Sequence, residues 1–342
     1  MPAPFTTNPA KNAVRLKWDT PLLQYLHDTY GFKYRYMGLP GVDLIDVRLW
    51  QHMIEEVIAF EPPDQSPSRR DAIQKLRTNM RKFGISGNAY YGSLEEVVIL
   101  GVDNDGQKYS QNNLVTLYNL DFCDEIASRI ETKERGERIW RFEAIRQILR
   151  DQEACYHKDR ANKYFILMIT FRNQIASNKI RSLLQNAQLL AEVDAFCQVG
   201  NSHVPLPMEN QALIGTHAWS LKAFLYNLLC GNFTNPHISA LFFPLVLYLG
   251  TPVKVTHPVK TILPSPMLHL VVLCKFADVE AASHITHPKG FIRSSSIEVS
   301  DGGDLDWKLL AGEENSIGFA PGSVPWLEEY GQLLLEGLGT RQ

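Results

Sequence analysis

Hydrophobic and polar positions along the first half of the chain alternate in a way that predicts strands separated by helices. The apolar runs that we interpret as buried strands cover residues 34–40, 57–61, 114–119 and 164–171. Apolar residues recur at helical spacing in other segments, at residues 42–56, 68–84 and 141–157. Strands that are apolar throughout and alternate with helices predict a mostly parallel sheet covered on both faces. This is an α/β, doubly wound, Rossmann-like fold.

The second half of the chain has a different pattern. Residues 181–250 have helical spacing and are interrupted by prolines, which predicts a helical insertion after a core of residues 31–180. Two strand-like runs follow, and the few residues between them suggest a C-terminal antiparallel hairpin that completes the sheet over residues 251–280. The expected organisation also includes an N-terminal segment at residues 1–30 and a C-terminal extension at residues 281–342.

Composition and charge narrow the class of protein. The 342 residues are 45% hydrophobic and 21% charged, and 34 basic against 37 acidic residues give a net charge of -3. No overall basic excess therefore indicates nucleic acid binding, although a local patch is compatible with it. The five cysteines are far apart and odd in number, which argues against disulfides and zinc and fits a reducing cytoplasm.

Targeting and metal-binding patterns in the sequence bear on the expected location and cofactors. The N-terminus does not have the pattern of a signal peptide. The longest apolar stretch, residues 238–250, is shorter than the roughly 20 residues that cross a bilayer. We therefore expect a cytoplasmic protein without a membrane partner. His284 and His287 have no third ligand nearby in the sequence, so we expect no metal site.

The stretch RYMGLPGVDLIDV, residues 35–47, breaks a short strand into glycines before a helix. Gly38 and Gly41 flank Pro40, and Asp43 can cap the helix that follows. Glycines at such a place allow a ligand to approach the backbone closely, because a side chain would block it. An ordinary turn that needs glycine for a positive φ explains the same residues, and both interpretations stay open.

Acidic and small residues follow the next two expected strands. Glu61 ends the strand at 57–61, where a carboxylate can accept hydrogen bonds from ribose hydroxyls, although a solvated strand end is the alternative. The third strand is followed by Tyr91, Gly92 and Ser93. Ser93 together with Glu96 has the pattern of a capping box, which by itself explains the serine.

Polar residues also follow the strand at 114–119. The sequence there is Asn119, Leu120, Asp121 and Phe122. The carboxyl ends of strands in doubly wound folds are where ligands bind. Asp121 is either a general base or a residue that closes the strand.

These four places resemble the class I S-adenosylmethionine-dependent methyltransferases, over roughly residues 30–276. The resemblance implies S-adenosylmethionine as cofactor, contacted by Gly38, Pro40, Gly41, Asp43, Glu61, Tyr91, Gly92 and Ser93. It implies that the end of the fourth strand faces the methyl acceptor, with the catalytic residues Asn119, Asp121 and Phe122. In amino-methyltransferases a polar residue there accepts a hydrogen bond from the acceptor and an aromatic ring stacks on it. This chain keeps both residue types but lacks the two prolines between them.

The acceptor and the partners stay open between nucleic acid and protein. Basic residues spread over the polar face of the expected helix at 68–83. They form either a strip that contacts phosphates or an ordinary solvated face. In-line methyl transfer depends mainly on positioning, so few catalytic side chains are needed. The alternative is a catalytically inactive Rossmann-like binding module in a multiprotein or nucleic-acid complex, for example in host defence or regulation. A dinucleotide oxidoreductase is disfavoured by the expected terminal hairpin.

Overall fold

The computed structural model describes two compact units of the chain. The described residues are 9–63, 70–122, 129–131, 138–158, 164–172, 238–242, 245–254, 262–276 and 296–299. The core unit comprises Leu26–Ile169. The second unit comprises Met1–Tyr25 together with Thr170–Gln342.

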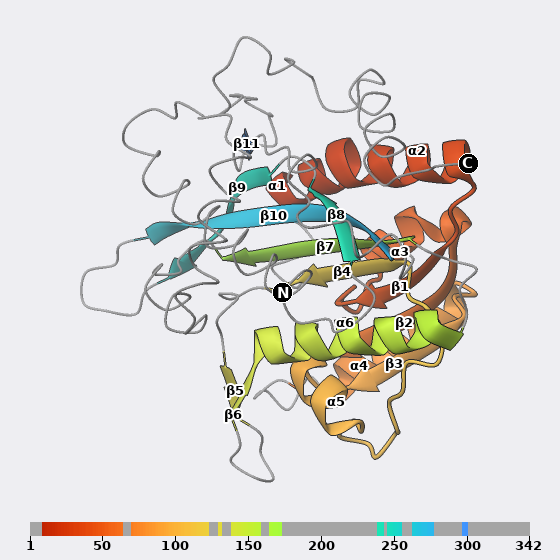
Figure 1. Ribbon diagram of the computed structural model, residues 1–342. Helices are drawn as coiled ribbons and strands as arrows, with labels where there is room; N and C mark the ends of the chain where they lie inside the picture. The colour runs from red at the N-terminus through yellow and green to blue at the C-terminus, as the bar shows by residue number, and fades with distance from the viewer. Residues whose placement is uncertain are drawn as a thin grey trace, which may run out of the picture. The chain divides into compact units, whose positions relative to one another are not determined.

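The core unit is built on a parallel β-sheet of five strands (Figure 1). The strands are β1 (Tyr34–Gly38), β2 (Ile54–Glu61), β3 (Gly87–Tyr91), β4 (Leu117–Asp121) and β7 (Tyr164–Arg172). Their order in the sheet is β3-β2-β1-β4-β7. The sequence-based expectation of adjacent parallel strands is therefore confirmed for this sheet, because all four expected segments lie in it.

The strand order reverses direction between β1 and β4. From β1 the chain proceeds to β2 and β3 on one side, and from β4 it proceeds to β7 on the other. Gly38, the last residue of β1, pairs in register with Ala59 of β2 and with Asn119 of β4. The carboxyl ends of β1, β2 and β4 therefore meet at this reversal, where open α/β sheets bind ligands.

Helices connect the strands of the core unit. They are α3 (Ile45–Leu49), α4 (Arg70–Lys82), α5 (Leu94–Leu100) and α6 (Arg141–Lys158). Because crossover connections between parallel strands are right-handed, α3 and α4 lie on one face of the sheet and α5 and α6 on the other. The last two helices contact each other. Gly84, with a φ of 66°, follows α4 as the sequence predicts.

The first connection differs from its prediction. A helix expected over residues 42–56 is instead the short α3, a 3₁₀ turn at Gln51–Met53 and the start of β2. Asp43 does not cap it, because the N-cap residue is Leu44, in a left-handed conformation without a side-chain cap. The apolar spacing that suggested a longer helix serves burial instead, since Trp50 and Met53 are both buried, at and just after the end of α3.

The core of this unit comes from apolar strand residues and the inward faces of the helices. Tyr34, Tyr36 and Tyr118 are completely buried strand residues. Ile148 and Leu149 contribute the buried face of α6. Burial of such side chains is worth about 1.5–3 kcal/mol each, so the sheet and its helices are held together mainly by apolar area.

A small hairpin interrupts the connection between β4 and α6. Its strands are β5 (Arg129–Glu131) and β6 (Arg138–Trp140), which pair antiparallel and form a separate two-stranded sheet. Figure 1 shows it beside the start of α6, which follows β6 directly.

The second unit contains the remaining elements. At the N-terminal end these are α1 (Pro9–Val14), a π-helical turn (Arg15–Asp19) and the beginning of α2 (Thr20–Tyr30). Later in the chain come β8 (Ile238–Phe242), β9 (Leu245–Lys254), β10 (Ile262–Phe276) and β11 (Ser296–Val299). Strand β10 pairs antiparallel with both β8 and β9, and β11 pairs parallel with β9.

The expected hairpin over residues 251–280 needs a correction of its bounds. The antiparallel pair consists of β9 and β10, and residues 255–261 between them lie outside the described part of the chain. Pro264 and Pro266 lie within β10, where a register shift between Leu263 and Ser265 accommodates the first of them.

Three polar side chains form a buried chain of hydrogen bonds in the second unit. His269 Nε2 lies 2.8 Å from Asp19 Oδ1, and its Nδ1 lies 2.8 Å from Thr170 Oγ1. All three residues are buried. They join the N-terminal segment, the end of β7 and β10, so buried polar groups are satisfied across segments that are far apart in sequence.

Other expectations fall partly or wholly outside the described residues. Of the expected helical insertion at 181–250, residues 238–242 and 245–250 lie in strands and the rest are not described. Most of the extension at 281–342 and both histidines of the pair at 284 and 287 are also outside. Among the described helices, none has the length and apolar character needed to cross a membrane.

Candidate functional site

The loop after β1 begins at a glycine that the sheet itself requires. A Cβ atom on Gly38 would collide with the carbonyl oxygen of Asn119 on the neighbouring strand. The same oxygen accepts a hydrogen bond from the backbone N–H of Leu39, at 3.2 Å. Gly38 therefore allows β1 and β4 to approach closely at the point where the strand order reverses.

Gly41 has a different role in this loop. Its φ is 65°, and a Cβ atom there would have no heavy atom within 4 Å. Leu44 follows with a φ of 53°, which is uncommon for a residue other than glycine. Two left-handed residues within four positions turn the chain sharply between Pro40, which is buried, and α3. The backbone at Gly41 is therefore uncovered by any side chain of its own and borders open space.

Helix α4 holds the same loop from the side. Asn79 Nδ2 donates a hydrogen bond to the carbonyl oxygen of Val42, at 2.8 Å. Lys75 Nζ lies 3.2 Å from Asp43 Oδ1, and both side chains are exposed. The exposed ion pair adds little stability. Asp43, expected near the cofactor, therefore lies on the surface between the loop and α4.

Glu61 is the last residue of β2 and is only 8% exposed. Its backbone carbonyl accepts a hydrogen bond from the N–H of Gly92, at 3.0 Å, which links the ends of β2 and β3. A Cβ atom on Gly92 would lie 2.6 Å from Val97 Cγ2, so this glycine is needed for packing of α5. The carboxylate of Glu61 is therefore buried at the end of β2, beside the end of β3.

Ser93 caps α5, as its sequence pattern predicts. Its Oγ accepts a hydrogen bond from the N–H of Glu96, at 3.2 Å, and lies 3.1 Å from Glu96 Oε2. The capping interpretation is confirmed by these contacts. The structure places Ser93 at the carboxyl edge of the sheet, next to Gly92 and Tyr91. A role of Ser93 in cofactor binding stays a prediction.

The end of β4 holds an oriented amide. Asn119 Nδ2 donates a hydrogen bond to Asp46 Oδ2 on α3, at 3.0 Å, and both residues are buried. Among the described residues, none hydrogen-bonds to Asn119 Oδ1. The carboxylate of Asp46 therefore fixes which end of the amide is a donor and leaves the carbonyl oxygen as an acceptor. Asp121 follows at the strand end and is partly buried.

A buried ion pair covers the aromatic residue of this strand end. Arg141 Nε lies 2.7 Å from Glu95 Oε1, with the two side chains 8% and 4% exposed. The Arg141 guanidinium also lies over the Phe122 ring, 4.2 Å from its centroid. Phe122 is 2% exposed. Helix α5, helix α6 and the end of β4 therefore meet at one cluster of charged and aromatic side chains.

The sequence interpretation did not identify Asp46, Glu95 or Arg141 as members of the candidate site. Asp46 was considered only as an acid of the first helical turn. Glu95 was considered only for its place after the third strand, where the resemblance implies the adenine. Their contacts join residues 73 and 46 positions apart, which no local pattern reveals. The one signal that the sequence offers is indirect: all three residues lie near strand ends, and the expected sheet brings strand ends together.

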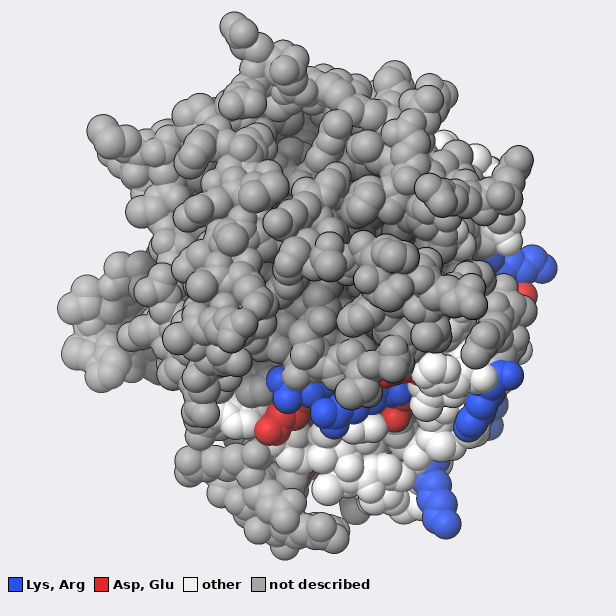
Figure 2. Space-filling model, viewed as in Figure 1, with Lys and Arg blue, Asp and Glu red and all other residues white. Residues whose placement is uncertain are grey.

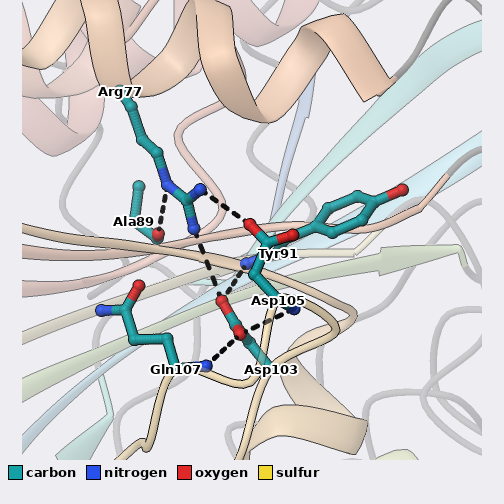
Figure 3. A network of polar contacts seen from close by, with 6 residues as sticks. All are labelled: Arg77, Ala89, Tyr91, Asp103, Asp105 and Gln107. Atoms are coloured by element: carbon teal, nitrogen blue, oxygen red, sulfur yellow. Dashed lines mark hydrogen bonds and ion pairs between the residues drawn. The ribbon is translucent and has the colours of Figure 1, made fainter.

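A second polar network lies at the edge strand β3 and is structural (Figure 3). Asp103 Oδ1 accepts from the N–H groups of Asp105 and Gln107, and its Oδ2 accepts from the N–H of Tyr91. Arg77 donates to the carbonyl of Ala89, at 3.1 Å, and pairs with Asp105, at 2.8 Å. The network satisfies outward-facing backbone groups of an edge strand. Among the described residues no cluster of metal-ligating side chains exists.

The basic helix expected at 68–83 is α4 with its neighbouring residues. Arg77 points into the Asp103 network, and Lys75 pairs with Asp43. Lys82 lies near the Phe83 ring, and Arg81 is exposed. Figure 2 shows basic and acidic side chains next to one another on the described surface. The expected phosphate-contacting strip is therefore reduced to a few cations, and its role stays a prediction.

Comparisons with known proteins give low similarity. No family model matches the chain, and no curated protein sequence does. Solved structures that it resembles include the O-methyltransferase TomG from Streptomyces achromogenes in complex with SAM, with 7% identity, a TM-score of 0.33 and coverage of 79% of this chain and 88% of that one.

Two other solved structures show similar values. An rRNA methylase from Streptococcus thermophilus has 10% identity and a TM-score of 0.32, covering 76% of this chain and 97% of that one. A precorrin 8w decarboxylase from Methanobacterium thermoautotrophicum has 9% identity and a TM-score of 0.26, with 76% and 90% covered. At these TM-scores the likeness says nothing about the function of this chain.

Proposed function

We propose that this chain is an S-adenosylmethionine-dependent methyltransferase that acts on an acceptor group in a nucleic acid or a protein. The observation that carries the proposal is the register match of Gly38 with Asn119 where the strand order reverses. It puts the glycine loop, the end of β2 and the end of β4 at one edge of a parallel sheet. Ligands of open α/β folds bind at such an edge.

The residues at this edge fit the cofactor. Gly41 has open space where a side chain would be, so a ligand can approach its backbone. Glu61 offers a buried carboxylate at the end of β2, the place from which an acid reaches ribose hydroxyls. Tyr91, at the end of β3, is partly exposed and has a ring face suited to a purine. S-adenosylmethionine would supply a methyl group on a positively charged sulfur.

The chain's own contribution to the reaction is positioning. Asp46 holds the Asn119 amide so that its Oδ1 can accept a hydrogen bond from an N–H or O–H of the acceptor. Asp121, two residues further along β4 than Asn119, is the candidate base for a proton that the acceptor loses. Holding an acceptor in line lowers the barrier because orientation is paid in advance by binding. The acceptor class follows from these groups as a nucleophile that donates a hydrogen bond.

We propose further that the β9–β10 pair continues the parallel sheet beyond β7. This is the finer form of the expected fold, with β10 as the antiparallel strand. The hydrogen bond between Thr170, on β7, and His269, on β10, supports it. A cysteine pair introduced on these two strands and tested for disulfide formation would check the adjacency directly.

A second candidate function is a binding module without catalysis. One observation favours it: Arg141 occupies one face of the Phe122 ring, and the ring is buried. A ring in that state is not available for stacking on an acceptor. In this case the carboxyl edge binds a ligand or partner but transfers no methyl group.

Calorimetry with S-adenosylmethionine, S-adenosylhomocysteine and NAD tests the proposal. Saturable binding of the first two and not the third supports a methyltransferase cofactor site. Binding of NAD alone would replace the proposal with a dinucleotide enzyme. If the two sulfur cofactors bind, transfer of a labelled methyl group to DNA, RNA or protein then separates catalysis from a binding module.

A further inference from the structure

A cavity of about 290 Å³ lies in the core unit, away from the candidate cofactor edge. It is lined by residues near the beginnings of the strands, among them Arg35 of β1, Glu56 of β2 and Asn88 of β3. Parallel strands all begin at one edge of the sheet and end at the other. The cavity is therefore on the amino side, and Gly41, Glu61 and Asn119 do not line it.

The short helix α5 explains why this part of the sheet is hollow. Residues Arg35, Glu56 and Asn88 share one face of the sheet, as their register shows. Helix α5 crosses that face but contains only Leu94–Leu100, and Gly101 ends it with a φ of 69°. At 1.5 Å per residue such a helix spans roughly 10 Å, so the connection to β4 covers the remainder. The outer wall of the cavity is this connection, which contributes Lys108 and Asn113.

The wall is rigid at its first end. The Asp103 carboxylate binds the N–H groups of Asp105 and Gln107, and Arg77 ties it to the edge of β3 (Figure 3). Asp103 is buried. Several charge-assisted hydrogen bonds on one buried carboxylate hold the backbone next to Lys108 in a single conformation.

The wall is equally fixed at its second end. Gln152 of α6 accepts from the N–H of Val115, at 2.9 Å, and donates to its carbonyl, at 2.7 Å. Gln111 and Tyr118 complete a buried network around the same side chain. The cavity is thus preformed, because both ends of its wall are anchored by satisfied buried polar groups.

The side chains that face this cavity include charges without an intramolecular partner. The cavity is open to solvent: Glu56 is half-buried, and Lys108, Asn88 and Asn113 are exposed. Among the described residues, no hydrogen bond or ion pair engages these four side chains. Glu56 and Lys108 line one cavity and do not pair with each other. Burial and the Asp103 carboxylate raise the pKa of Tyr90, which also lines it, so its phenol stays a hydrogen-bond donor.

We propose that this cavity binds a small zwitterion of the amino-acid type, with its ammonium group at Glu56 and its carboxylate at Lys108. The amides of Asn88 and Asn113 and the phenol of Tyr90 add donors and acceptors for the polar remainder of the ligand. A ligand with both charges can pair at once with an acid and a base that line the same cavity and do not pair with each other. The site is independent of the proposed cofactor edge.

The test is calorimetry on the full chain with the common L-amino acids, one at a time. Acetate and methylammonium serve as probes that carry only one of the two charges. We expect saturable binding of at least one amino acid and no measurable binding of either single-charge probe. Loss of a charge-assisted contact should weaken binding about tenfold or more in each of Glu56→Gln and Lys108→Gln.

Three control variants make the test specific. Asp71→Asn and Lys33→Gln change exposed charges outside the cavity and should leave affinity unchanged. Glu61→Gln lies at the opposite edge and should also leave it unchanged, which separates this proposal from the cofactor proposal. Unfolding midpoints show whether each variant is folded. Absence of binding by every amino acid overturns the proposal, as does equal binding of acetate with no loss in Glu56→Gln.

Discussion

Two groups of buried acids in the core unit differ in what they hold together. Asp103, beside the edge strand β3, binds backbone N–H groups and Arg77, all within a short loop and its neighbours. Asp46 and Glu95, near the carboxyl ends of the strands, bind side chains from distant segments, namely Asn119 and Arg141. The first group fixes backbone, whereas the second orients side chains.

The difference has a physical reason. A carboxylate surrounded by N–H groups has its acceptor capacity filled, so it closes a loop and leaves nothing for a ligand. A carboxylate that accepts a hydrogen bond from the NH₂ group of an amide leaves the amide oxygen available for another donor, as at Asn119. The Asp103 group therefore acts as scaffold, whereas ligand recognition at the carboxyl edge is the role that we propose. Substitutions in the two groups should separate stability from binding.

The largest effect is expected for Arg141→Met. It leaves Glu95 as a buried carboxylate without its cation, which costs about 3–5 kcal/mol of unfolding free energy. Chemical denaturation measures it. Arg150→Met, an exposed arginine on the same helix, is the matched control and should change stability little. The double variant Arg141→Met with Glu95→Gln should recover much of the loss. A single variant as stable as the wild type would show that the pair is not a buried anchor.

Asp103→Asn should have the next largest effect. An amide that keeps its oxygen at the Oδ1 place loses the charge that binds Arg77 and the acceptor for the N–H of Tyr91, at a cost of about 2–3 kcal/mol. Asp105→Asn removes an exposed partner of the same arginine and should cost much less. If Asp103 only closes a loop, affinity for S-adenosylmethionine stays unchanged in folded Asp103→Asn. A large loss of affinity at unchanged stability would erase the distinction between the two groups.

Gly41→Val combines a smaller stability effect with a binding effect. A branched residue at a φ of 65° is strained by about 1–2 kcal/mol, so some stability is lost even where space is open. Gly84→Val is a close control, because Gly84 has a φ of 66° and an equally open Cβ direction at the end of α4. Both variants should lose similar stability. Only Gly41→Val should lose affinity for S-adenosylmethionine, and equal affinity in both would make the loop a simple turn.

Much of the sheet was predictable from the sequence, because apolar runs such as 164–171 are read directly as buried strands. The first helix was not. Its apolar spacing from Val42 to Met53 satisfies a helix equally well, and a left-handed Leu44 has no sequence signal. Tertiary burial of Trp50 decided the outcome.

The candidate site was predictable only where residues lie at or just after strand ends. Gly41, Glu61 and Asn119 were identified as candidates in this way, since strand ends meet at one edge of a parallel sheet. The partners of these residues were not found, because Asp46 and Arg141 reach the edge from helices whose bounds and rotation depend on packing. The close approach that Gly38 permits was also hidden, as it depends on the register of β1 with β4.

The central claim is that the carboxyl edge binds S-adenosylmethionine, and Glu61 tests it most directly. Calorimetry should show saturable binding to the wild type and about tenfold or greater weakening in Glu61→Gln, since a charge-assisted hydrogen bond to ribose is lost. Glu55→Gln, on the same strand but exposed, should bind as the wild type does. Equal affinity of the wild type and Glu61→Gln, or no binding by the wild type, would contradict the account.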